Sequence, residues 1–301
     1  MDNQRNERRN LKRLRRIELG TQKRSPLGRT ILWLIIAVFT IWTMFPIFWA
    51  IITSFKHTGD AFNPTFIPWV QFKPTLQGWH FVFITAGERT LRSLKNSILI
   101  ASCSSALVLL LGAFAGYSLG RFVFRGWKNK DIAVWILSNR MFPPVAVVIP
   151  YFLFMRTLRL LDNPLAIIMA HTVLNLPLGV WLMMDFFRDL PRDLEDAAFI
   201  DGCSHLGAFF RVALPLAAPG LVAVYVLSFI FSWNEFIFVL VLGFHKATTI
   251  PILIAGALTS KGLEFWKVAS ISLIGIIPVV ILTTFVSKFL VRGLTFGALK
   301  E

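Results

Sequence analysis

The sequence predicts an all-α protein that crosses a membrane several times. Of its 301 residues, 55% are hydrophobic and only 16% are charged, a balance that would leave a soluble domain insoluble. Several apolar runs of about 20 residues are each long enough for a helix to cross a hydrocarbon core of about 30 Å. Counting these runs predicts a polytopic membrane protein with six transmembrane helices and both termini in the cytoplasm.

Six apolar segments are assigned as spans within one transmembrane domain, residues 30–301. The first contains Pro46, which we expect to kink it. The second contains Gly112, Gly116 and Gly120 at four-residue spacing, so another helix can pack closely against it. The predicted spans cover residues 31–52, 97–119, 132–155, 164–186, 221–243 and 268–291.

Residues 1–29 form a basic tail with ten Lys or Arg and three acidic residues. Nucleic-acid binding is one reading of such clusters, but no aromatic interleaving or binding module accompanies them. Positive residues beside a membrane segment hold that end in the cytoplasm and attract anionic lipid headgroups. The turn at residues 121–130, with four basic residues, indicates the same side. We therefore expect membrane lipid, and no nucleic acid, as a partner.

Three of the predicted spans contain polar residues, which are costly inside a membrane. Asn139 and Arg140 fall in the third span, Asn175 in the fourth, and Asn234 and Glu235 in the fifth. These groups could pair with each other or with backbone and hold the helices together. They could instead line a hydrated path for a polyhydroxylated solute, because amides both donate and accept hydrogen bonds and carboxylates accept them. Both interpretations stay open at this point.

The sequence gives little support for catalysis. The five histidines are scattered, and neither they nor Cys103 and Cys203 form a metal-binding spacing. There is no Gly-x-Ser-x-Gly nucleophile motif. The segment from Gly120 to Lys128 lacks the spacing and the Gly-Lys-Ser/Thr ending of a phosphate loop. We expect no enzyme activity, no metal site and no cofactor on this chain.

The most informative segment is a polar island between two apolar runs, residues 187–219. Asp193 can cap a helix with Asp196 at its third position, and carboxylates suit the positive end of a helix. Gly202 can take the left-handed turn that ends it. Such an acidic helix is most often only a solvated surface helix. The alternative is a short helix that docks in a socket of another protein, because Ala197 and Ala198 leave its middle without bulk.

The order of residues in this island resembles the coupling loop, or EAA loop, of bacterial ABC-importer permeases. The residues that carry the resemblance are Glu195, Asp196, Ala197, Ala198, Asp201, Gly202, Leu214 and Pro215. The glutamate that usually precedes the two alanines is Asp196 here, and Glu195 just before it can share the role. Two further stretches, residues 233–235 and 292–298, look like the second permease subunit of carbohydrate-uptake importers, the maltose-permease branch.

The resemblance implies a type I importer architecture in the bacterial cytoplasmic (inner) membrane and uptake of a sugar, polyol or sugar derivative. It implies a second permease subunit, two ATP-binding subunits and an extracytoplasmic solute-binding protein as partners. ATP and magnesium would bind the ATP-binding subunits, not this chain. The island residues would then couple ATP hydrolysis to the spans.

The solute pathway would draw on the polar residues within the spans, namely Asn139, Arg140, Asn175, Asn234 and Glu235. The rival reading is a self-contained secondary transporter or a membrane-embedded enzyme. A secondary transporter should show internal repeats, and an enzyme should show a reactive constellation. The sequence shows neither clearly.

Overall fold

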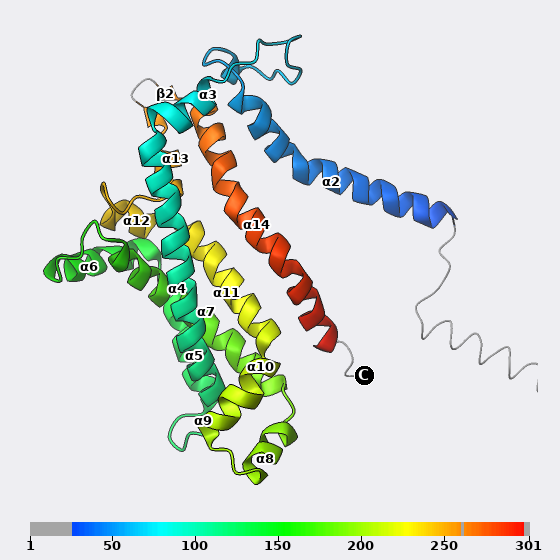
Figure 1. Cartoon of the computed structure of the whole chain (residues 1–301), viewed down its shortest axis with the longest axis vertical. Coiled ribbons are helices and arrows are strands. Elements are labelled where there is room, and N and C mark those ends of the chain that lie inside the picture. The colour runs from blue at the N-terminus through cyan, green and yellow to red at the C-terminus, as the bar shows by residue number, and fades with distance from the viewer. Residues whose placement is uncertain (1–25, 260–261, 298–301) are drawn as a thin grey trace, which may run out of the picture. The chain divides into compact units, whose positions relative to one another are not determined.

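The computed structural model describes residues 26–259 and 262–297, and most of this part of the chain is helical (Figure 1). Contacts within the chain define two units, residues 1–49 and residues 50–301. The described part of the first unit belongs to α2 (Pro26–Ser54), an apolar helix that continues through Pro46. The packing described below is that of the second unit.

Among the described residues, four helices are long and apolar enough to cross a membrane: α2, α4 (Gly87–Arg121), α7 (Pro164–Asp189) and α14 (Phe265–Gly297). Two bent helix pairs pass the same test if each counts as one span. One joins α5 (Asn129–Ser138) and η3 (Asn139–Met141) to α6 (Pro144–Thr157) with a bend of 89°. The other bends by 75° where α11 (Ala218–Trp233) begins.

The third and fifth predicted spans are not continuous helices in the structure. The third breaks at Phe142 and Pro143, because proline has no N–H to donate and forces the preceding residue out of the helical conformation. The fifth ends at Trp233, and a separate short helix, α12 (Ile237–Leu242), follows. The second predicted span is too short, since α4 starts at Gly87 rather than at residue 97.

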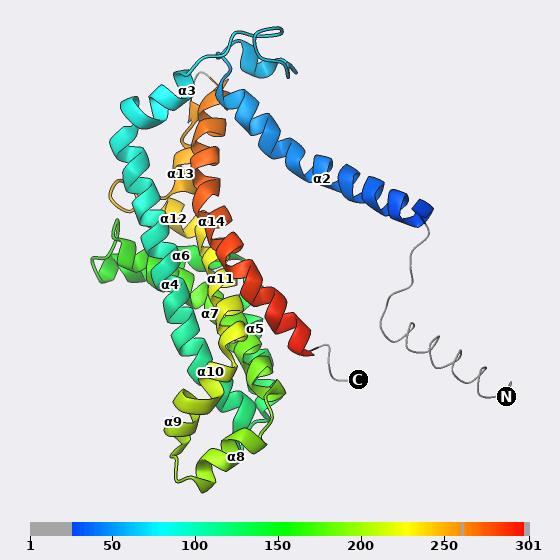
Figure 2. The ribbon, with the colours of Figure 1, turned by 45° about the vertical axis from the view of Figure 1, so that its right-hand side comes forward.

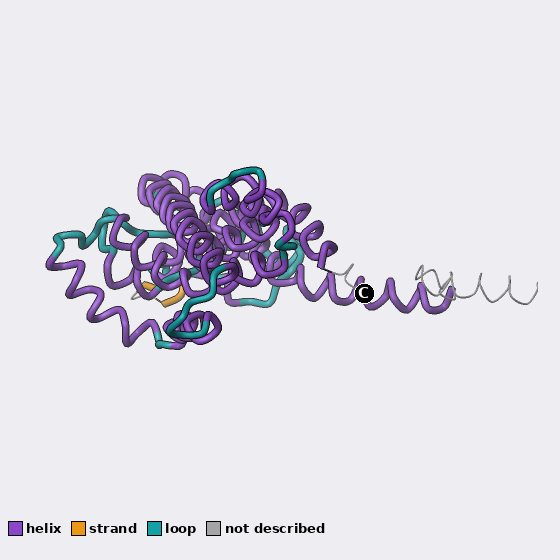
Figure 3. Tube along the Cα trace, turned by 90° about the horizontal axis from the view of Figure 1, so that it is seen from below, coloured by secondary structure: helices purple, strands orange, loops and turns teal. Residues whose placement is uncertain are grey.

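Short elements connect these helices. Before α4 lie η1 (Asp60–Phe62), α3 (Gln77–His80) and η2 (Phe81–Thr85), and before α14 lies α13 (Ile250–Ala255). Between α7 and α11 lie α8 (Asp193–Ile200), α9 (His205–Ala208), η4 (Phe209–Ala213) and α10 (Leu214–Leu216). In the described chain the sheet structure is a two-stranded antiparallel ladder, β1 (Leu258–Thr259) with β2 (Gly262–Leu263), drawn in orange in Figure 3.

The second unit is organised around the contact between α4 and α7, its most extensive helix pair. A Cβ atom added to Gly116 would lie 2.6 Å from the Cβ of Met183 and 2.7 Å from the backbone nitrogen of Met184. Added Cβ atoms at Gly112 and Gly120 would each come within 3.2 Å of the α7 backbone. The close packing predicted from the glycine row is confirmed.

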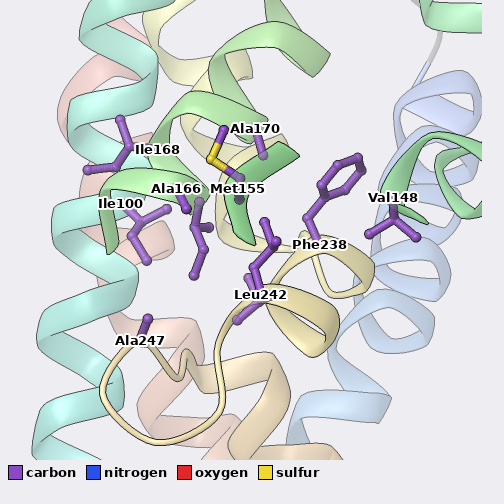
Figure 4. Close-up of a cluster of buried hydrophobic side chains, with 11 residues drawn as sticks. Ile100, Val148, Met155, Ala166, Ile168, Ala170, Phe238, Leu242 and Ala247 are labelled. Carbon is purple, nitrogen blue, oxygen red and sulfur yellow. The ribbon is translucent and has the colours of Figure 1, made fainter. Parts of the chain in front are cut away.

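The largest apolar cluster joins α6, α7 and α12 (Figure 4). Met155, Phe238 and Leu242 lie within it and are almost completely buried. This cluster holds α12 in place beyond the end of α11 at Trp233. A second cluster, around Phe187 and Phe209, packs η4 and the segment that enters α11 against α4 and α7.

A single carboxylate fixes the loop that follows α12. Asp162, in the turn after α6, accepts hydrogen bonds from the backbone N–H groups of residues 244–247 at 2.9–3.1 Å. Burial raises the pKa of this carboxyl, but the backbone donors outweigh burial and hold the pKa below its ordinary value. We call this arrangement the Asp162 clasp.

Gly116→Ala tests the contact between α4 and α7. Since the added methyl group would collide with backbone atoms that cannot rotate away, we expect a loss of about 1–3 kcal/mol of stability. Thermal unfolding of the purified protein in detergent measures it. Gly126→Ala is the matched control, because its added Cβ meets nothing within 4 Å. Equal unfolding midpoints for the two variants would contradict the packing argument.

The Asp162 clasp predicts a pH dependence with a definite sign. Because folding lowers the pKa of this carboxyl, its stabilisation is complete above the ordinary Asp value of about 3.9 and is lost as the pH falls through the folded value. Asp162→Asn should therefore unfold at a lower temperature than wild type at neutral pH, with a difference that shrinks in acid. Asp131→Asn, at an exposed acid, is the control. A difference independent of pH would contradict the clasp.

Candidate functional site

The polar island forms the short helix α8, which both views of the ribbon place beside α9 at the end of the second unit far from α3 (Figure 2). The predicted cap is wrong. The helix starts after Arg192 without a side-chain cap, and Asp193 is its first residue, because Arg192 already has a helical backbone. Asp193, Glu195 and Asp196 all fall in the first turn, where the helix dipole favours negative charge.

The end of α8 is the one that the sequence predicts. Gly202 has a φ of +82°, in the left-handed region that glycine enters at low cost. The N–H of Gly202 bonds to the carbonyl of Phe199, and the N–H of Cys203 bonds to that of Ala198. This pair of bonds is a Schellman motif, which satisfies the last carbonyls of the helix and turns the chain sharply.

The two acids of α8 have different surroundings. Glu195 is 6% exposed and forms an ion pair with Arg121, at the end of α4, with an O–N distance of 2.6 Å. Its other oxygen accepts a hydrogen bond of 2.7 Å from the hydroxyl of Tyr117, also on α4. Asp196 is exposed. Glu195 thus fixes α8 to α4 within the chain, whereas Asp196 is available to another molecule.

Arg121 extends this anchor to the chain that enters α8. Its guanidinium also donates to the carbonyl of Leu190 at 3.1 Å, and its side chain is only 6% exposed. The sequence places Arg121 only in a basic turn, because nothing local indicates that it faces an acid 74 positions away. A cavity of about 210 Å³ adjoins the anchor and is lined by Tyr117, Arg121, Phe122, Arg192, Glu195, Asp196, Phe199 and His205.

The other island residues divide between the two sides of this segment. Ala198 is buried, and Leu214 packs on the apolar cluster around Phe187 and Phe209. Ala197, Asp201 and Pro215 are exposed. Together with Asp196 and the 87%-exposed side chain of Ile200, the exposed residues near α8 form a surface that combines acidic and apolar groups.

A second group of predicted site residues meets at the bend of the third span. Arg140 donates to the carbonyl of Leu174 at 3.3 Å and to the Oδ1 of Asn175 at 3.4 Å, both on α7. Its guanidinium also lies over the ring of Phe231 on α11, 4.6 Å from the ring centre. Arg140 therefore joins three elements while remaining partly exposed.

Glu235 does not pair with Arg140; of the two pairings that the sequence left open, both residues use the one with backbone groups. One Glu235 oxygen accepts from the backbone N–H groups of Ile237 and Phe238 and so caps α12. The other lies 3.1 Å from the Nε2 of His171. His171 Nδ1 is 2.6 Å from the hydroxyl of Ser232, to which Ser104 donates, so this buried chain links α4, α7 and α11.

The remaining amides are not part of either group. Asn139 and Asn234 are exposed, and each bonds to carbonyls of its own helical turn. The structure thus brings Arg140 and Asn175 together, with Asn234 one turn beyond Phe231 on α11. In the sequence His171 is one of five scattered histidines, and its bond to Glu235 depends on the fold. Within the described residues no group of three or more His, Cys, Asp or Glu side chains could hold a metal ion.

A multi-pass helical bundle with polar bends in its spans and an acidic helix anchored at one end defines a membrane transport permease. Residues 108–296 match the family model described as "Binding-protein-dependent transport system inner membrane component". The chain belongs to this family. It is a permease of ABC importers, a multi-pass membrane subunit and not an enzyme, since ATP hydrolysis in this class resides in partner subunits.

Individual relatives are similar in sequence to this chain along most of its length. The sulfoquinovosyl glycerol transport system permease protein SmoH of Agrobacterium fabrum is 35% identical over 91% of this chain and 94% of its own. The trehalose/maltose transport system permease protein MalG of Thermococcus litoralis is also 35% identical, over 85% of this chain and 91% of its own.

A solved structure shares the fold. It is a chain of a bacterial ABC transporter involved in the import of the acidic polysaccharide alginate, with a TM-score of 0.68 and 24% identity. The match covers 89% of this chain and 99% of that chain. At this identity the likeness supports the helical architecture alone.

Glu195→Gln tests the anchor of α8. The change leaves the cation of Arg121 buried without its counter-ion, and breaking a buried pair costs about 3–5 kcal/mol. We expect the backbone amides of residues 195–203 to exchange with solvent markedly faster, as measured by hydrogen exchange and mass spectrometry. Asp196→Asn, one position away but exposed, is the matched control. The same protection in both variants would contradict the assignment of Glu195 as the anchor.

Proposed function

We propose that this permease takes up a sugar, polyol or sugar derivative and that α8 couples the spans to ATP hydrolysis by two partner subunits. The observation that supports the coupling role is the difference in surroundings between two adjacent acids. Glu195 fixes α8 to the end of α4, and Asp196 faces outward on the same turn. A helix attached in this way can transmit to α4 a force that is applied to its exposed side.

The proposed orientation follows from the positions of the charges. The basic turn at residues 121–130 lies at the same end of α4 as α8, and basic residues favour the cytoplasmic side. We place α8 and both termini in the cytoplasm, with six spans if each bent pair crosses once. The start of α4 at Gly87 then lies on the extracytoplasmic side of the bacterial inner membrane.

The proposed partners are a second permease subunit, two ATP-binding subunits that bind ATP and magnesium, and an extracytoplasmic solute-binding protein. The description of the matching family supports a binding protein. A second solved structure with this fold, at a TM-score of 0.61 and 14% identity, is a bacterial alginate ABC transporter in complex with an alginate pentasaccharide-bound periplasmic protein. The stated functions of SmoH and MalG support a solute that carries sugar hydroxyls.

The proposed solute pathway passes the bend at Arg140. There a guanidinium, the Asn175 amide and the face of Phe231 meet, and such groups suit hydroxyls on one side and an apolar sugar face on the other. Asn139 and Asn234 are close in sequence to Arg140 and Phe231, and both are exposed. We include them in the proposed pathway. Glu235 contributes by holding the break between α11 and α12, since its oxygens are engaged with α12 and His171.

Asp196→Lys in the reconstituted importer tests the coupling role. Charge reversal changes helix stability by only about 0.3–1 kcal/mol at an exposed helix start, so the chain should still insert and fold. We expect the ATP-binding subunits to dissociate, or to hydrolyse ATP without driving uptake of radiolabelled sugar into proteoliposomes.

Asp131→Lys is the matched control, because Asp131 is an exposed acid in the first turn of a different helix, α5. Its uptake should stay near that of wild type. Normal ATP-driven uptake by the Asp196→Lys variant at full expression would show that α8 is only a solvated surface helix.

A further inference from the structure

Four polar side chains are hydrogen-bonded in series through the interior of the second unit. Ser104 of α4 donates to Ser232 of α11 at 3.0 Å, and the Ser232 hydroxyl lies 2.6 Å from the Nδ1 of His171 on α7. The Nε2 of His171 lies 3.1 Å from a carboxylate oxygen of Glu235, which follows the end of α11. Ser104, His171 and Ser232 are buried, and the Glu235 side chain is 14% exposed. We call these residues the His171 network.

The surroundings of Glu235 place a hydrogen on the Nε2 of His171. The two carboxylate oxygens accept from the backbone N–H groups of Ile237 and Phe238 at 2.9–3.1 Å. These donors fit an ionised carboxylate, which only accepts hydrogen bonds. Imidazole is also a stronger base than a carboxylate, so a proton shared by the two groups resides on the ring. The nitrogen that faces Glu235 is therefore a donor.

The other ring nitrogen accepts a hydrogen bond. In the described part of the chain, the Ser232 hydroxyl bonds to two groups, Ser104 and His171. Because Ser104 donates to it, the single hydrogen of Ser232 is left for the Nδ1 of His171. The donors thus point in one direction along the network and end on the carboxylate. Since the partner of one ring nitrogen sets the state of the other, His171 is the neutral tautomer with its hydrogen on Nε2.

One competing arrangement would make His171 a cation. Ser104 can also donate to the carbonyl of Ala101, at 3.2 Å. Ser232 would then donate to Ser104 and accept from a protonated Nδ1, so both ring nitrogens would carry hydrogen. The distance from Ser104 to Ser232 is the shorter of the two, and burying a cation beside the anion adds a desolvation cost. Both observations favour the neutral ring.

The His171 network lies next to the proposed solute pathway on two helices. His171 is one helical turn before Asn175 on α7, so both residues lie on one face of that helix. Ser232 directly follows Phe231 on α11. Glu235 holds the first N–H groups of α12. A shift of this carboxylate would therefore move the break between α11 and α12, beside the pathway.

We propose that His171 is a positioning residue for sugar uptake. Its Nε2–H holds the Glu235 carboxylate at the start of α12 and so sets the conformation of the break between α11 and α12. His171 itself does not touch the solute and acts through Glu235. The inference rests on the proposed function for the pathway beside the break, whereas the proton assignment of the ring rests on the hydrogen bonds alone.

Nitrogen-15 NMR tests the proton assignment, with the complete importer in nanodiscs and its histidines labelled. The chain has five histidines, and the signals of His171 are those that disappear in the His171→Gln variant. We expect one bare and one protonated ring nitrogen at neutral pH, with the hydrogen on Nε2. A hydrogen on Nδ1 alone, or on both nitrogens, would overturn the assignment.

Two amide variants test the positioning role. Glutamine can place its amide where Nε2 lies and still donate to Glu235, whereas the shorter asparagine reaches only the position of Nδ1 beside Ser232. We measure uptake of radiolabelled sugar into proteoliposomes at matched assembly and basal ATP hydrolysis. We expect uptake within about threefold of wild type for His171→Gln and a loss of about tenfold or more for His171→Asn, because the variants differ by a hydrogen bond to a charged group.

His80→Asn is the matched control, because His80 is exposed on α3, and its uptake should equal that of wild type. A role limited to packing predicts equal losses of uptake and equal drops in unfolding temperature for both His171 variants. That result, or normal uptake by His171→Asn, would overturn the positioning role and leave the proposed function standing. A wild-type importer that hydrolyses ATP without taking up any sugar would instead overturn the proposed function.

Discussion

The close contact between α4 and α7 is the constraint on which the rest of the second unit depends. At Gly116 the two backbones are too close for any Cβ atom, and at Gly112 and Gly120 an added Cβ would fit only tightly. The 35 residues of α4 make a rod about 52 Å long at 1.5 Å per residue. Two segments are attached to this rod, α8 at its last residue and the loop after α12 near its start.

The two attachments suit different demands. At Arg121 the link to α8 is a buried ion pair, whose rupture leaves an uncompensated charge, so a force on α8 is more easily passed to α4 than released between them. At the other end the loop after α12 is fixed by neutral hydrogen bonds from Asn96 and by the many backbone donors of the Asp162 clasp. One end of α4 is therefore suited to transmit a force, and the other holds a loop in one conformation.

Local chemistry decided which features the sequence could predict. Gly202, the glycine row on α4 and the apolar runs follow from single-residue conformational preferences or periodicity, and the structure has all three. In the sequence, the break at Pro143 shows only as a predicted span that contains polar residues. The break at Trp233 left little trace, because the run is uniformly apolar and its cap, Glu235, is oriented by His171, 64 positions away. The inward position of Glu195 was equally hidden, since its partners Tyr117 and Arg121 lie on a different helix.

The polar residues of the spans differ in the groups to which they form hydrogen bonds. Backbone groups at membrane depth need partners wherever a helix breaks, and Glu235 supplies them at the start of α12. Its remaining capacity is taken by His171, so Glu235 can change its contacts only if the bend itself changes. Arg140 makes longer bonds of 3.3 and 3.4 Å and keeps part of its surface exposed at the other bend. A solute hydroxyl can replace the contacts of Arg140 without disordering a helix end, whereas replacing those of Glu235 would leave the start of α12 without its hydrogen bonds. Arg140 is therefore suited to a pathway and Glu235 to a hinge.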